Sequence, residues 1–455
     1  MNRATLTERY LERLREQRPG AAELIGRQPE LPVLTSDSPG FLARPLFLGH
    51  QEREQLTADL EHFRTALLSL PEQLFGGDLA AFARAAGMTE VQISAILRSR
   101  QSDHVSRMAR ADLCVDASGF FKLLECNMSS ALGGMENPVM ARALLEHPLL
   151  AEFAGEHRLA VGDTVRALAR TMYAETGYGA GGCPVVAVAD FPTSYLNGFH
   201  EFVTPFAGLL RDLGVDAHPC HIGEFEYHDG RVWLGERAVD VILRVFINED
   251  VLESPEAPSI MDPVLAAVEA GQVKLFGSMD SEIFNSKAAL AMLSDEANRS
   301  LFNAEQLAAL DRLLPWTRMV RDGEVTLEDG SQADLFAYGI AHQAELVLKP
   351  AVSHGGSGVL LGWDENVTAA EWRARLTEAL GGPYVLQRRI HPLPEYFPDQ
   401  HGELQPWLVV WGVFMMADGY AGVLARGSRV DSGVGVVNCA NGAFCGTALH
   451  ELPPV

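Results

Sequence analysis

Apolar residues along this chain fall into two patterns, which together predict a mixed α/β protein. In the first hundred residues they recur three or four positions apart among charged residues, as is typical of helices with one buried face. The segments with this spacing are Leu6–Gln17, Glu52–Ser69 and Asp78–Arg98, with a Pro-, Ser- and Gly-rich loop at Pro32–Pro45. Residues 1–108 are therefore expected to form a mainly helical region.

Short apolar runs then replace the helical spacing and predict a β-hairpin. Arg110–Val115 and Phe120–Asn127 each have the length of a strand. The turn Asp116–Gly119 between them is short enough to pair them directly. Two further segments with helical spacing follow, Val139–Phe153 and Leu159–Glu175.

Polar side chains lie at one end of this predicted hairpin. Side chains two positions apart on a strand share a face, so Arg110 projects with Asp112, and Glu125 projects with Asn127. Two carboxylates and an amide oxygen form a hard oxygen site that suits Mg²⁺ held together with phosphate oxygens. Acidic residues at strand ends are also commonly solvated, so this stretch alone leaves both interpretations open. Cys126, between the two proposed ligands, is expected to point into the core.

A strand–helix–strand pattern comes next and predicts a small doubly wound α/β unit. It follows a Gly-rich linker at Gly177–Pro184. Its predicted elements are the strand Val185–Ala189, the helix Phe199–Leu213 and the strands Val215–Cys220, Trp233–Leu234 and Val239–Phe246. The glycine fingerprint of dinucleotide-binding folds does not occur here, which disfavours a pure Rossmann oxidoreductase.

Two lysines in the second half of the chain lie where a nearby anion would explain their positions. Lys287 begins a predicted helix, where a cation is unfavourable against the helix dipole unless it points to water or faces an anion. Lys349 ends the apolar strand Leu346–Leu348, and a lysine buried there needs a nearby anion. The loop after Lys349 contains Gly355, Gly356, Ser357 and Gly358, whose backbone amides could approach phosphates closely. It is not a P-loop, and a glycine hairpin by itself is more often a simple turn.

The remaining apolar runs predict further strands. Tyr384–Arg389 carries Gln387 near its end, and its backbone could pair with an adenine. Arg426 offers a guanidinium suited to phosphoryl or carboxylate oxygens. The last predicted strands are Trp407–Met416, Gly422–Arg426 and Val434–Asn438.

Composition narrows the possible functions. Hydrophobic residues make up 47% of the 455 residues, and charged residues 21%, as in ordinary globular proteins. The net charge of -24 makes nucleic acid and anionic membrane surfaces unexpected partners. We see no secretory signal and no apolar run of about 20 residues. The six cysteines contain no Cys-x-x-Cys pair, which argues against zinc, and we expect reduced thiols in a cytoplasmic protein.

Taken together, these motifs resemble the ATP-grasp superfamily in its circularly permuted form, and within it the synthetase domain of glutathionylspermidine synthase. Arg110-Ala111-Asp112 and Lys122-Leu123-Leu124-Glu125-Cys126-Asn127 look like that family's Arg-x-Asp and Lys-Leu-Leu-Glu-x-Asn motifs. As in the permuted group, the Glu-x-Asn motif precedes the two lysines. The resemblance implies an α/β fold with a helical N-terminal region and a doubly wound pre-ATP-grasp subdomain. The implied divisions are 1–108, 109–176, 177–280 and 281–455.

The resemblance also implies roles for individual residues. Asp112, Glu125 and Asn127 would bind Mg²⁺, and Arg110 and Arg426 would be catalytic. Ser130 aligns with a substrate-binding serine, but the rest of its loop, Met128–Gly134, departs from the family pattern, which puts glutathione and spermidine themselves in doubt. The residues that would bind ATP are Lys287, Lys349, Gly355, Gly356, Ser357, Gly358 and Gln387.

The implied activity is that of an ATP-dependent carboxylate–amine ligase. It would join a small-molecule or short-peptide carboxylate to an amine through an acyl-phosphate, and release ADP and phosphate. Two alternatives remain at this stage: a phosphotransferase of the same fold that acts on a non-carboxylate acceptor, and a non-catalytic nucleotide-binding protein. An unrelated α/β enzyme with chance motifs is a further possibility.

Overall fold

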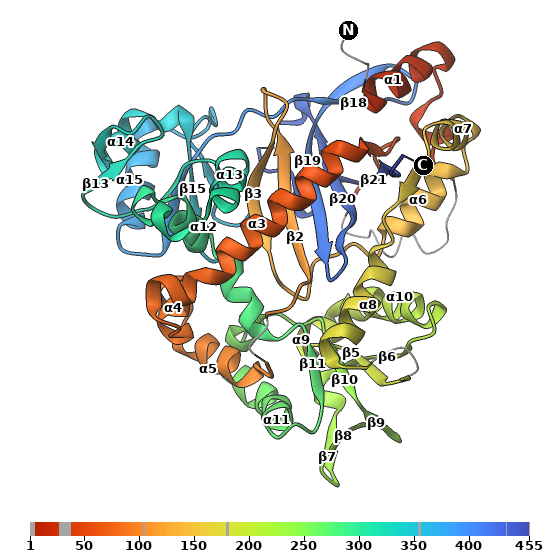
Figure 1. The fold of residues 1–455 in the computed structure, drawn as a ribbon, viewed down its shortest axis with the longest axis vertical. Helices are drawn as coiled ribbons and strands as arrows, with labels where there is room; N and C mark the ends of the chain where they lie inside the picture. Colours follow the sequence, from red (N-terminus) through yellow and green to blue (C-terminus); the bar gives the residue numbers. More distant parts are fainter. Residues whose placement is uncertain are drawn as a thin grey trace.

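A computed structural model describes residues 5–26, 38–102, 105–178, 182–353, 356–433 and 435–454. The molecule has a large central sheet, an α/β lobe with a parallel sheet, and a C-terminal lobe with an antiparallel sheet (Figure 1). The mixed α/β fold predicted from the apolar pattern is confirmed. Within the described residues, we find no helix that combines the length and the apolarity needed to cross a bilayer.

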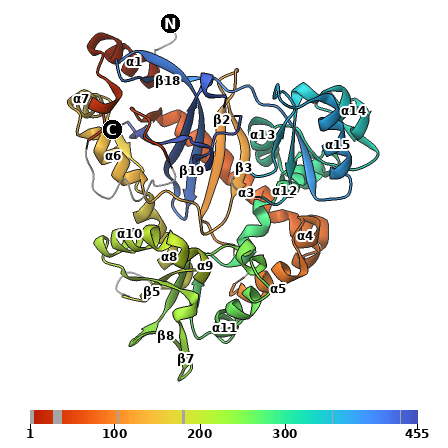
Figure 2. The ribbon, with the colours of Figure 1, turned by 180° about the vertical axis from the view of Figure 1, so that it is seen from behind.

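The central sheet joins strands from both ends of the chain. Its order is β1-β21-β20-β19-β2-β3, with β18 added beside β19 and β4 beside β21. The predicted hairpin is present as β2 and β3, and its neighbour β19 comes from nearly 300 residues later (Figure 2). The strands are β1 (Leu46–Leu48), β2 (Ala109–Val115), β3 (Phe121–Asn127), β4 (Leu159–Val161), β18 (Glu395–Pro398), β19 (Leu404–Met416), β20 (Gly419–Arg429) and β21 (Phe444–Glu451).

One face of this sheet is covered by the long helix α3 (His50–Phe75), which crosses it in Figure 1. Alternate residues of β2, such as Ala111 and Leu113, are buried in the same apolar cluster as Leu60 and Phe63 of α3. Because strand side chains alternate, Arg110 and Asp112 must face the other side. The other helices beside the sheet are α1 (Leu6–Gln17), α6 (Asn137–Leu145), α7 (Pro148–Glu156) and α8 (Thr164–Thr176). The helices α4 (Leu79–Ala85) and α5 (Glu90–Ser99) instead lead from α3 to the α/β lobe, where α5 packs against α11 (Ala257–Glu269).

Several predicted boundaries in this part are wrong. The segment 78–98 forms two helices, because Gly87 takes a left-handed φ of 94° and Thr89 caps the second helix. The predicted helix 139–153 is broken before Pro148, which begins α7. Residues 159–161 are the strand β4 rather than helix, since α8 begins only after Asp163 caps it. The short strand β1 was not predicted.

The α/β lobe has a parallel sheet of order β11-β10-β5-β6, with α10 packed on one face and α11 on the other. The predicted strand at Trp233–Leu234 belongs to a separate antiparallel sheet, β7-β8-β9, and is wrong as part of the parallel unit. The elements are β5 (Val185–Asp190), α9 (Pro192–Ser194), α10 (His200–Asp212), β6 (Asp216–His221), β7 (Glu226–His228), β8 (Arg231–Leu234), β9 (Arg237–Val239), β10 (Val241–Arg244), α11 (Ala257–Glu269) and β11 (Lys274–Phe276).

The C-terminal lobe has an antiparallel sheet of order β12-β17-β15-β16. Strands β15 and β16 confirm the glycine-rich hairpin. The lobe consists of α12 (Lys287–Ser294), α13 (Ala304–Leu313), β12 (Thr317–Met319), β13 (Glu324–Thr326), β14 (Gln332–Asp334), α14 (Leu335–Ala341), β15 (Leu346–Pro350), β16 (Leu360–Leu361), α15 (Ala369–Ala379) and β17 (Tyr384–Arg388).

The strand predicted at Val434–Asn438 is also wrong. Val434 lies outside the described residues, and 435–438 is not extended into a strand. Gly433 takes a left-handed φ of 70° at the end of a short helical turn, which interrupts the strand direction. The strand that follows β20 is instead β21, which was not predicted.

A buried ion pair joins the α/β lobe to the start of the C-terminal lobe. Arg244, at the end of β10, is fully buried and paired with Glu282. Arg244 also donates to the carbonyl of Phe246 over 2.8 Å, and Glu282 accepts from the amide of Asn248 over 2.8 Å. Glu282 lies in the 3₁₀ segment η5 (Met279–Asn285), which leads directly into α12. The pair therefore fixes the segment from which Lys287 projects.

Substitution Glu282→Gln should lower the free energy of unfolding by about 3–5 kcal/mol, because it leaves the Arg244 charge buried without its partner. Urea denaturation followed by circular dichroism measures the change. Asp311→Asn removes one partner of the exposed Arg299–Asp311 pair and serves as the control, with an expected loss under about 1 kcal/mol. Equal losses in the two variants would contradict a structural role for the buried pair.

Candidate active site

The hairpin brings Asp112 and Glu125 together as the sequence predicted. They are direct partners across β2 and β3, and Arg110 is the partner of Asn127. The register shifts immediately afterwards, so that Leu124 is an extra residue on β3. This bulge lets Leu123 and Cys126 both face the apolar core, while Glu125 faces the opposite side. The prediction that Cys126 points into the core is confirmed.

Asp112 is the centre of a buried charge cluster. Its carboxylate accepts hydrogen bonds from Arg110 Nε over 2.8 Å and Nη2 over 3.0 Å, and from Asn127 Nδ2 over 3.2 Å. Arg426 Nη2 of β20 lies 2.6 Å from Asp112 Oδ1. Burial by itself would raise the pKa of Asp112, but Arg110 and Arg426 more than offset this and hold the pKa well below its ordinary value. Asp112 is therefore ionised in the folded protein.

Arg426 keeps unused hydrogen-bonding capacity. Its Nε has no hydrogen-bond partner within the described residues, while its Nη2 forms the ion pair with Asp112. Burial opposes its charge, but Asp112 raises the pKa of Arg426 above its ordinary value. A buried guanidinium with free donors beside a cavity is suited to accept an oxyanion.

Lys287 faces an anion. The sequence had left open whether this lysine points to water or to an anion. Its Nζ is 3.2 Å from Glu125 Oε2 and donates to the carbonyl of Ser353 over 3.2 Å. The preceding residue, Ser286, caps α12, so the lysine projects from the first turn of that helix. Its side chain is only 5% exposed. The Glu125 carboxylate offsets both the buried charge and its unfavourable place at the helix N-terminus.

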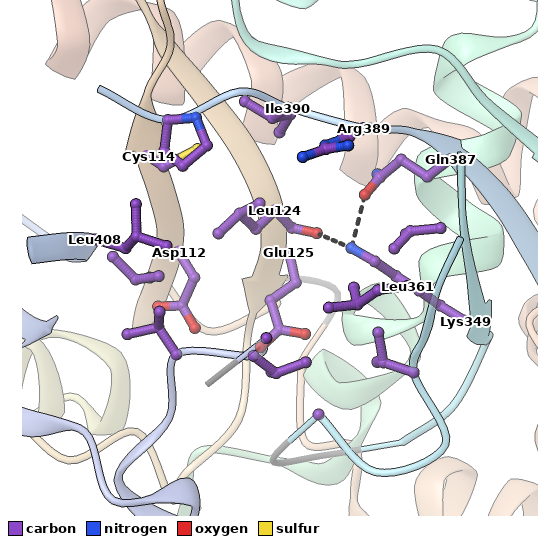
Figure 3. A pocket seen from close by; sticks show the side chains of 18 of the residues that line it. Asp112, Cys114, Leu124, Glu125, Lys349, Leu361, Gln387, Arg389, Ile390 and Leu408 are labelled. Atoms are coloured by element: carbon purple, nitrogen blue, oxygen red, sulfur yellow. Dashed lines mark hydrogen bonds between the residues drawn. The ribbon is translucent and has the colours of Figure 1, made fainter. Parts of the chain in front are cut away.

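Lys349 lies opposite the hairpin, on β15. Its Nζ donates to Gln387 Oε1 over 2.6 Å and to the carbonyl of Leu124 over 3.3 Å (Figure 3). Gln387 in turn donates to Thr317 Oγ1 over 3.0 Å, which fixes the orientation of its amide. Burial, together with the nearby Lys287 charge, lowers the pKa of Lys349 to about 8. Both predicted lysines thus reach the same site, and Gln387 holds one of them.

These side chains border a cavity of about 450 Å³ between the central sheet and the antiparallel sheet of the C-terminal lobe. Asp112, Glu125, Lys287, Lys349 and Arg426 all line it. Its remaining walls are mostly apolar and include Val347, Leu361, Trp363, Ile390, Leu408 and Val437. A cavity of this size with a charged end and an apolar end is typical of a site for a polar small molecule.

The other predicted residues have different positions. Gly356 lines the cavity with a left-handed φ of 77°, whereas Ser357 and Gly358 are not among its lining residues. Gly355 lies outside the described residues. Ser130 is buried, and its hydroxyl donates to the carbonyl of Phe246 over 3.0 Å rather than facing the cavity.

Some cavity residues were not predicted. The segment 435–438 after β20 forms one wall. Arg389 stacks over the ring of Trp363 at 4.3 Å, and both line the cavity. Neither feature has a local signature, because 435–438 reads as an apolar strand and Trp363 and Arg389 are distant in sequence.

The charges around the cavity favour an anion. The cationic side chains that line it are those of Lys287, Lys349, Arg388, Arg389 and Arg426, against the carboxylates of Asp112 and Glu125. This local excess contrasts with the net charge of -24 of the whole chain. Two of the four lysines in the entire sequence face this one cavity. The cavity is therefore suited to a ligand with several negative charges, such as a polyphosphate.

A divalent cation also fits the donor set. Asp112 and Glu125 contribute carboxylate oxygens, and Asn127 uses its nitrogen toward Asp112, which leaves its amide oxygen as an acceptor. No cluster of three or more His, Cys, Asp or Glu side chains with metal-binding geometry occurs in the described part of the chain. Two carboxylates and an amide form an incomplete shell, as expected for a magnesium ion shared with phosphate oxygens and water.

The fold of this chain is similar to that of a solved protein structure. No protein-family model matches the sequence, and no curated protein matches it. Among solved structures, the chain is similar to a glutathione synthetase-like effector from Globodera pallida in its apo form, with a TM-score of 0.54 and 10% identity. The match covers 91% of this chain and 90% of that one.

A protein from Methylobacillus flagellatus KT, described as a candidate γ-glutamylcysteine synthetase, has a TM-score of 0.41 and 13% identity over 84% of this chain and 86% of its own. The first similarity shows that the chain has the fold of a synthetase-like protein.

The lowered pKa of Lys349 predicts unusual reactivity. At pH 8 about half of its amino groups should be neutral, against roughly 1% or less for an ordinary lysine. Acetic anhydride labelling followed by peptide mass spectrometry should therefore modify Lys349 with a midpoint near pH 8. The exposed Lys274, which does not line the cavity, is the internal reference for the labelling reaction. Identical pH profiles for the two lysines would contradict the burial argument.

Proposed function

We propose that this protein is an ATP-dependent carboxylate–amine ligase with a circularly permuted ATP-grasp fold. The observation that carries the proposal is the convergence of Asp112 and Glu125 with Lys287, Lys349 and Arg426 around one cavity. These residues come from β2, β3, α12, β15 and β20, and their types match the oxygen ligands and phosphate-binding cations that phosphoryl transfer requires. The similarity to a synthetase-like fold supports the same assignment.

The proposed divisions follow the arrangement of the sheets. The helical region 1–108 would cover the central sheet, and 109–176 would contribute the metal-ligand hairpin. The α/β lobe would be 177–280, and 281–455 would hold the nucleotide. In this arrangement the metal-ligand hairpin precedes the nucleotide-binding region in sequence, yet its strand β2 pairs with β19 near the end of the chain. This pairing supports a permuted order of the elements.

ATP would lie in the cavity with its phosphates toward the charged end. The apolar walls would hold the adenine, and the backbone after Gln387 would pair with its edge. Lys287, Lys349 and the amide of Gly356 would contact the phosphate oxygens, with Glu125 and Gln387 holding the two lysines in place before ATP binds. Asp112, Glu125 and Asn127 would hold Mg²⁺, which when bound would neutralise phosphate charge.

The reaction would then need positioning and charge stabilisation rather than a protein nucleophile. An oxygen of the substrate carboxylate would attack the γ-phosphorus, and ADP would leave with the electrons of the broken P–O bond. The amine would attack the carbonyl carbon of the acyl-phosphate. Inorganic phosphate would leave with the electrons of the broken C–O bond and take up the proton that the amine loses. The free donors of Arg426 would stabilise the charge on the transferred group, and Arg110 would hold Asp112 and so fix the position of Arg426.

The experiment that tests this function is ADP release from ATP and magnesium in the presence of pooled acids and amines, with mass spectrometry of the products. ADP release that depends on both an acid and an amine, with a new amide mass, is the expected result. ADP release without an amide would instead indicate a phosphotransferase. Tight ATP binding without turnover in any pool would indicate a nucleotide-binding protein.

Lys349→Ala should lower kcat/KM for ADP release by about 100-fold or more, because it removes a preorganised cation from the phosphate site. Lys274→Ala, at an exposed position outside the cavity, is the matched control and should leave turnover unchanged. Thermal unfolding checks that both variants fold. Normal ADP release by a folded Lys349→Ala protein would exclude the assignment.

Glu125→Gln should raise the magnesium concentration needed for half-maximal ATP turnover by at least about tenfold, because the charge of the ligand set sets the affinity for a hard cation. Glutamine has nearly the same shape as glutamate, and its amide oxygen can still accept a hydrogen bond from Lys287. The control is Glu324→Gln on the exposed edge of β13. An unchanged magnesium dependence in Glu125→Gln would remove this residue from the metal site.

A further inference from the structure

Two cysteines lie in contact next to the cavity wall 435–438. Cys439 Sγ is 3.2 Å from Cys445 Sγ. Cys445 is buried on β21, where its direct partner on β20 is Arg426. Cys439 begins the short helical turn η9 (Cys439–Asn441) and is partly exposed. No other two cysteines have sulfur atoms in contact in the part of the chain that the structure describes. A disulfide bond of about 2.05 Å would require the two sulfurs to approach by about 1 Å.

The turn that carries Cys439 is rigidly connected to the cavity wall 435–438. The carbonyl of Asn438 accepts hydrogen bonds from the amides of Asn441 over 2.9 Å and Ala443 over 3.0 Å. Asn441 Nδ2 also donates to the carbonyl of Val436 over 3.2 Å. These bonds close the segment into one unit, so a displacement of Cys439 is transmitted to the wall.

The wall also contacts the glycine-rich hairpin on the far side of the cavity. A Cβ added at Gly435 would lie 2.6 Å from Leu361 of β16, and one added at Gly356 would lie 2.7 Å from Val436. At Gly356 the left-handed φ of 77° also favours glycine, so the hairpin and the wall approach each other closely there. The wall 435–438 thus contacts two other parts of the structure. The cysteines connect it to β21, and the close contacts at Gly435 and Gly356 connect it to the hairpin.

We propose that Cys439 and Cys445 are a reversible oxidation site, at which a peroxide-class oxidant forms a disulfide that fixes the cavity wall to the central sheet. The partly exposed Cys439 is the thiol that a small oxidant can reach, and the buried Cys445 is the thiol placed to resolve it.

The chemistry balances with hydrogen peroxide as the oxidant. The Cys439 thiolate attacks one peroxide oxygen, the O–O bond breaks, and the departing hydroxide takes up the thiol proton as water. Cys439 is then a sulfenic acid. The Cys445 sulfur attacks the Cys439 sulfur, the S–O bond breaks, and the second oxygen leaves as water with the Cys445 proton. Two thiols have lost two electrons, and the peroxide has gained them.

The effect on ligand binding rests on the proposed function. Formation of the bond would draw η9 toward β21. The wall 435–438 would then move away from the hairpin of β15 and β16, which lies across the cavity. The wall would then make a poorer contact with ATP in the cavity. We expect the Kd of ATP to rise at least about fivefold on oxidation.

Differential alkylation after graded hydrogen peroxide tests the bond itself. Trypsin cleaves after Arg429 and releases one peptide that holds both cysteines and no other. The expected result is that this peptide loses two hydrogens in mass, resists alkylation, and recovers both thiols with dithiothreitol. Cys439→Ser should abolish the change, whereas Cys183→Ser, at an exposed cysteine outside the pair, should not. Free alkylation of both cysteines after peroxide, or irreversible oxidation of Cys439, would overturn the proposal.

Calorimetric titration of ATP into the reduced and oxidised full-length protein tests the coupling. The expected rise in Kd should be absent in Cys439→Ser. Equal affinities of the reduced and the disulfide forms would overturn the coupling to the cavity. If the reduced protein binds no ATP, the proposed function and the coupling are both wrong, while the alkylation result still decides whether the disulfide forms.

Discussion

The ionised carboxylate of Asp112, buried between two guanidinium groups, is the interaction on which the site depends. It connects Arg110 of its own strand, Asn127 of β3 and Arg426 of β20. An unpaired charge at this depth would be strongly unfavourable, so each partner is required by the others. The cluster therefore ties together the ends of β2, β3 and β20 that face the cavity.

The lysines extend this network into the C-terminal lobe. Glu125 holds Lys287 from α12, and Lys349 from β15 reaches the carbonyl of Leu124 at the bulge. The contacts across the cavity are thus mostly polar, whereas behind it the apolar cluster of the central sheet continues into α12 and α13. The antiparallel sheet has an apolar cluster of its own. A cavity closed by ion pairs and hydrogen bonds can exchange some of these partners for phosphate oxygens, because the ligand offers charges of the same sign as the carboxylates.

The fold similarity and the site chemistry are independent observations. The solved synthetase-like effector shares the arrangement of the chain at 10% identity, which carries no information about individual residues. The residue types at the cavity come from this chain alone. Their agreement with phosphoryl transfer is the reason for proposing a ligase.

Local patterns in the sequence were sufficient to predict the hairpin of β2 and β3, the parallel α/β unit and the glycine-rich hairpin, since alternation and turn length are properties of neighbouring residues. They also predicted that Asp112, Glu125, Lys287 and Lys349 belong to one site, although that prediction depended on a resemblance in motif order. Only the tertiary structure decided that Arg426 pairs with Asp112 and that Ser130 faces backbone carbonyls.

The tertiary structure also decided that 435–438 forms a cavity wall instead of a strand, and that Cys439 lies against Cys445. Pairing between strands nearly 300 residues apart, and the strain relieved by glycines such as Gly433, depend on how the whole chain packs. No local pattern contains that information, because the free energy of a long-range contact depends on partners that the neighbouring sequence does not specify.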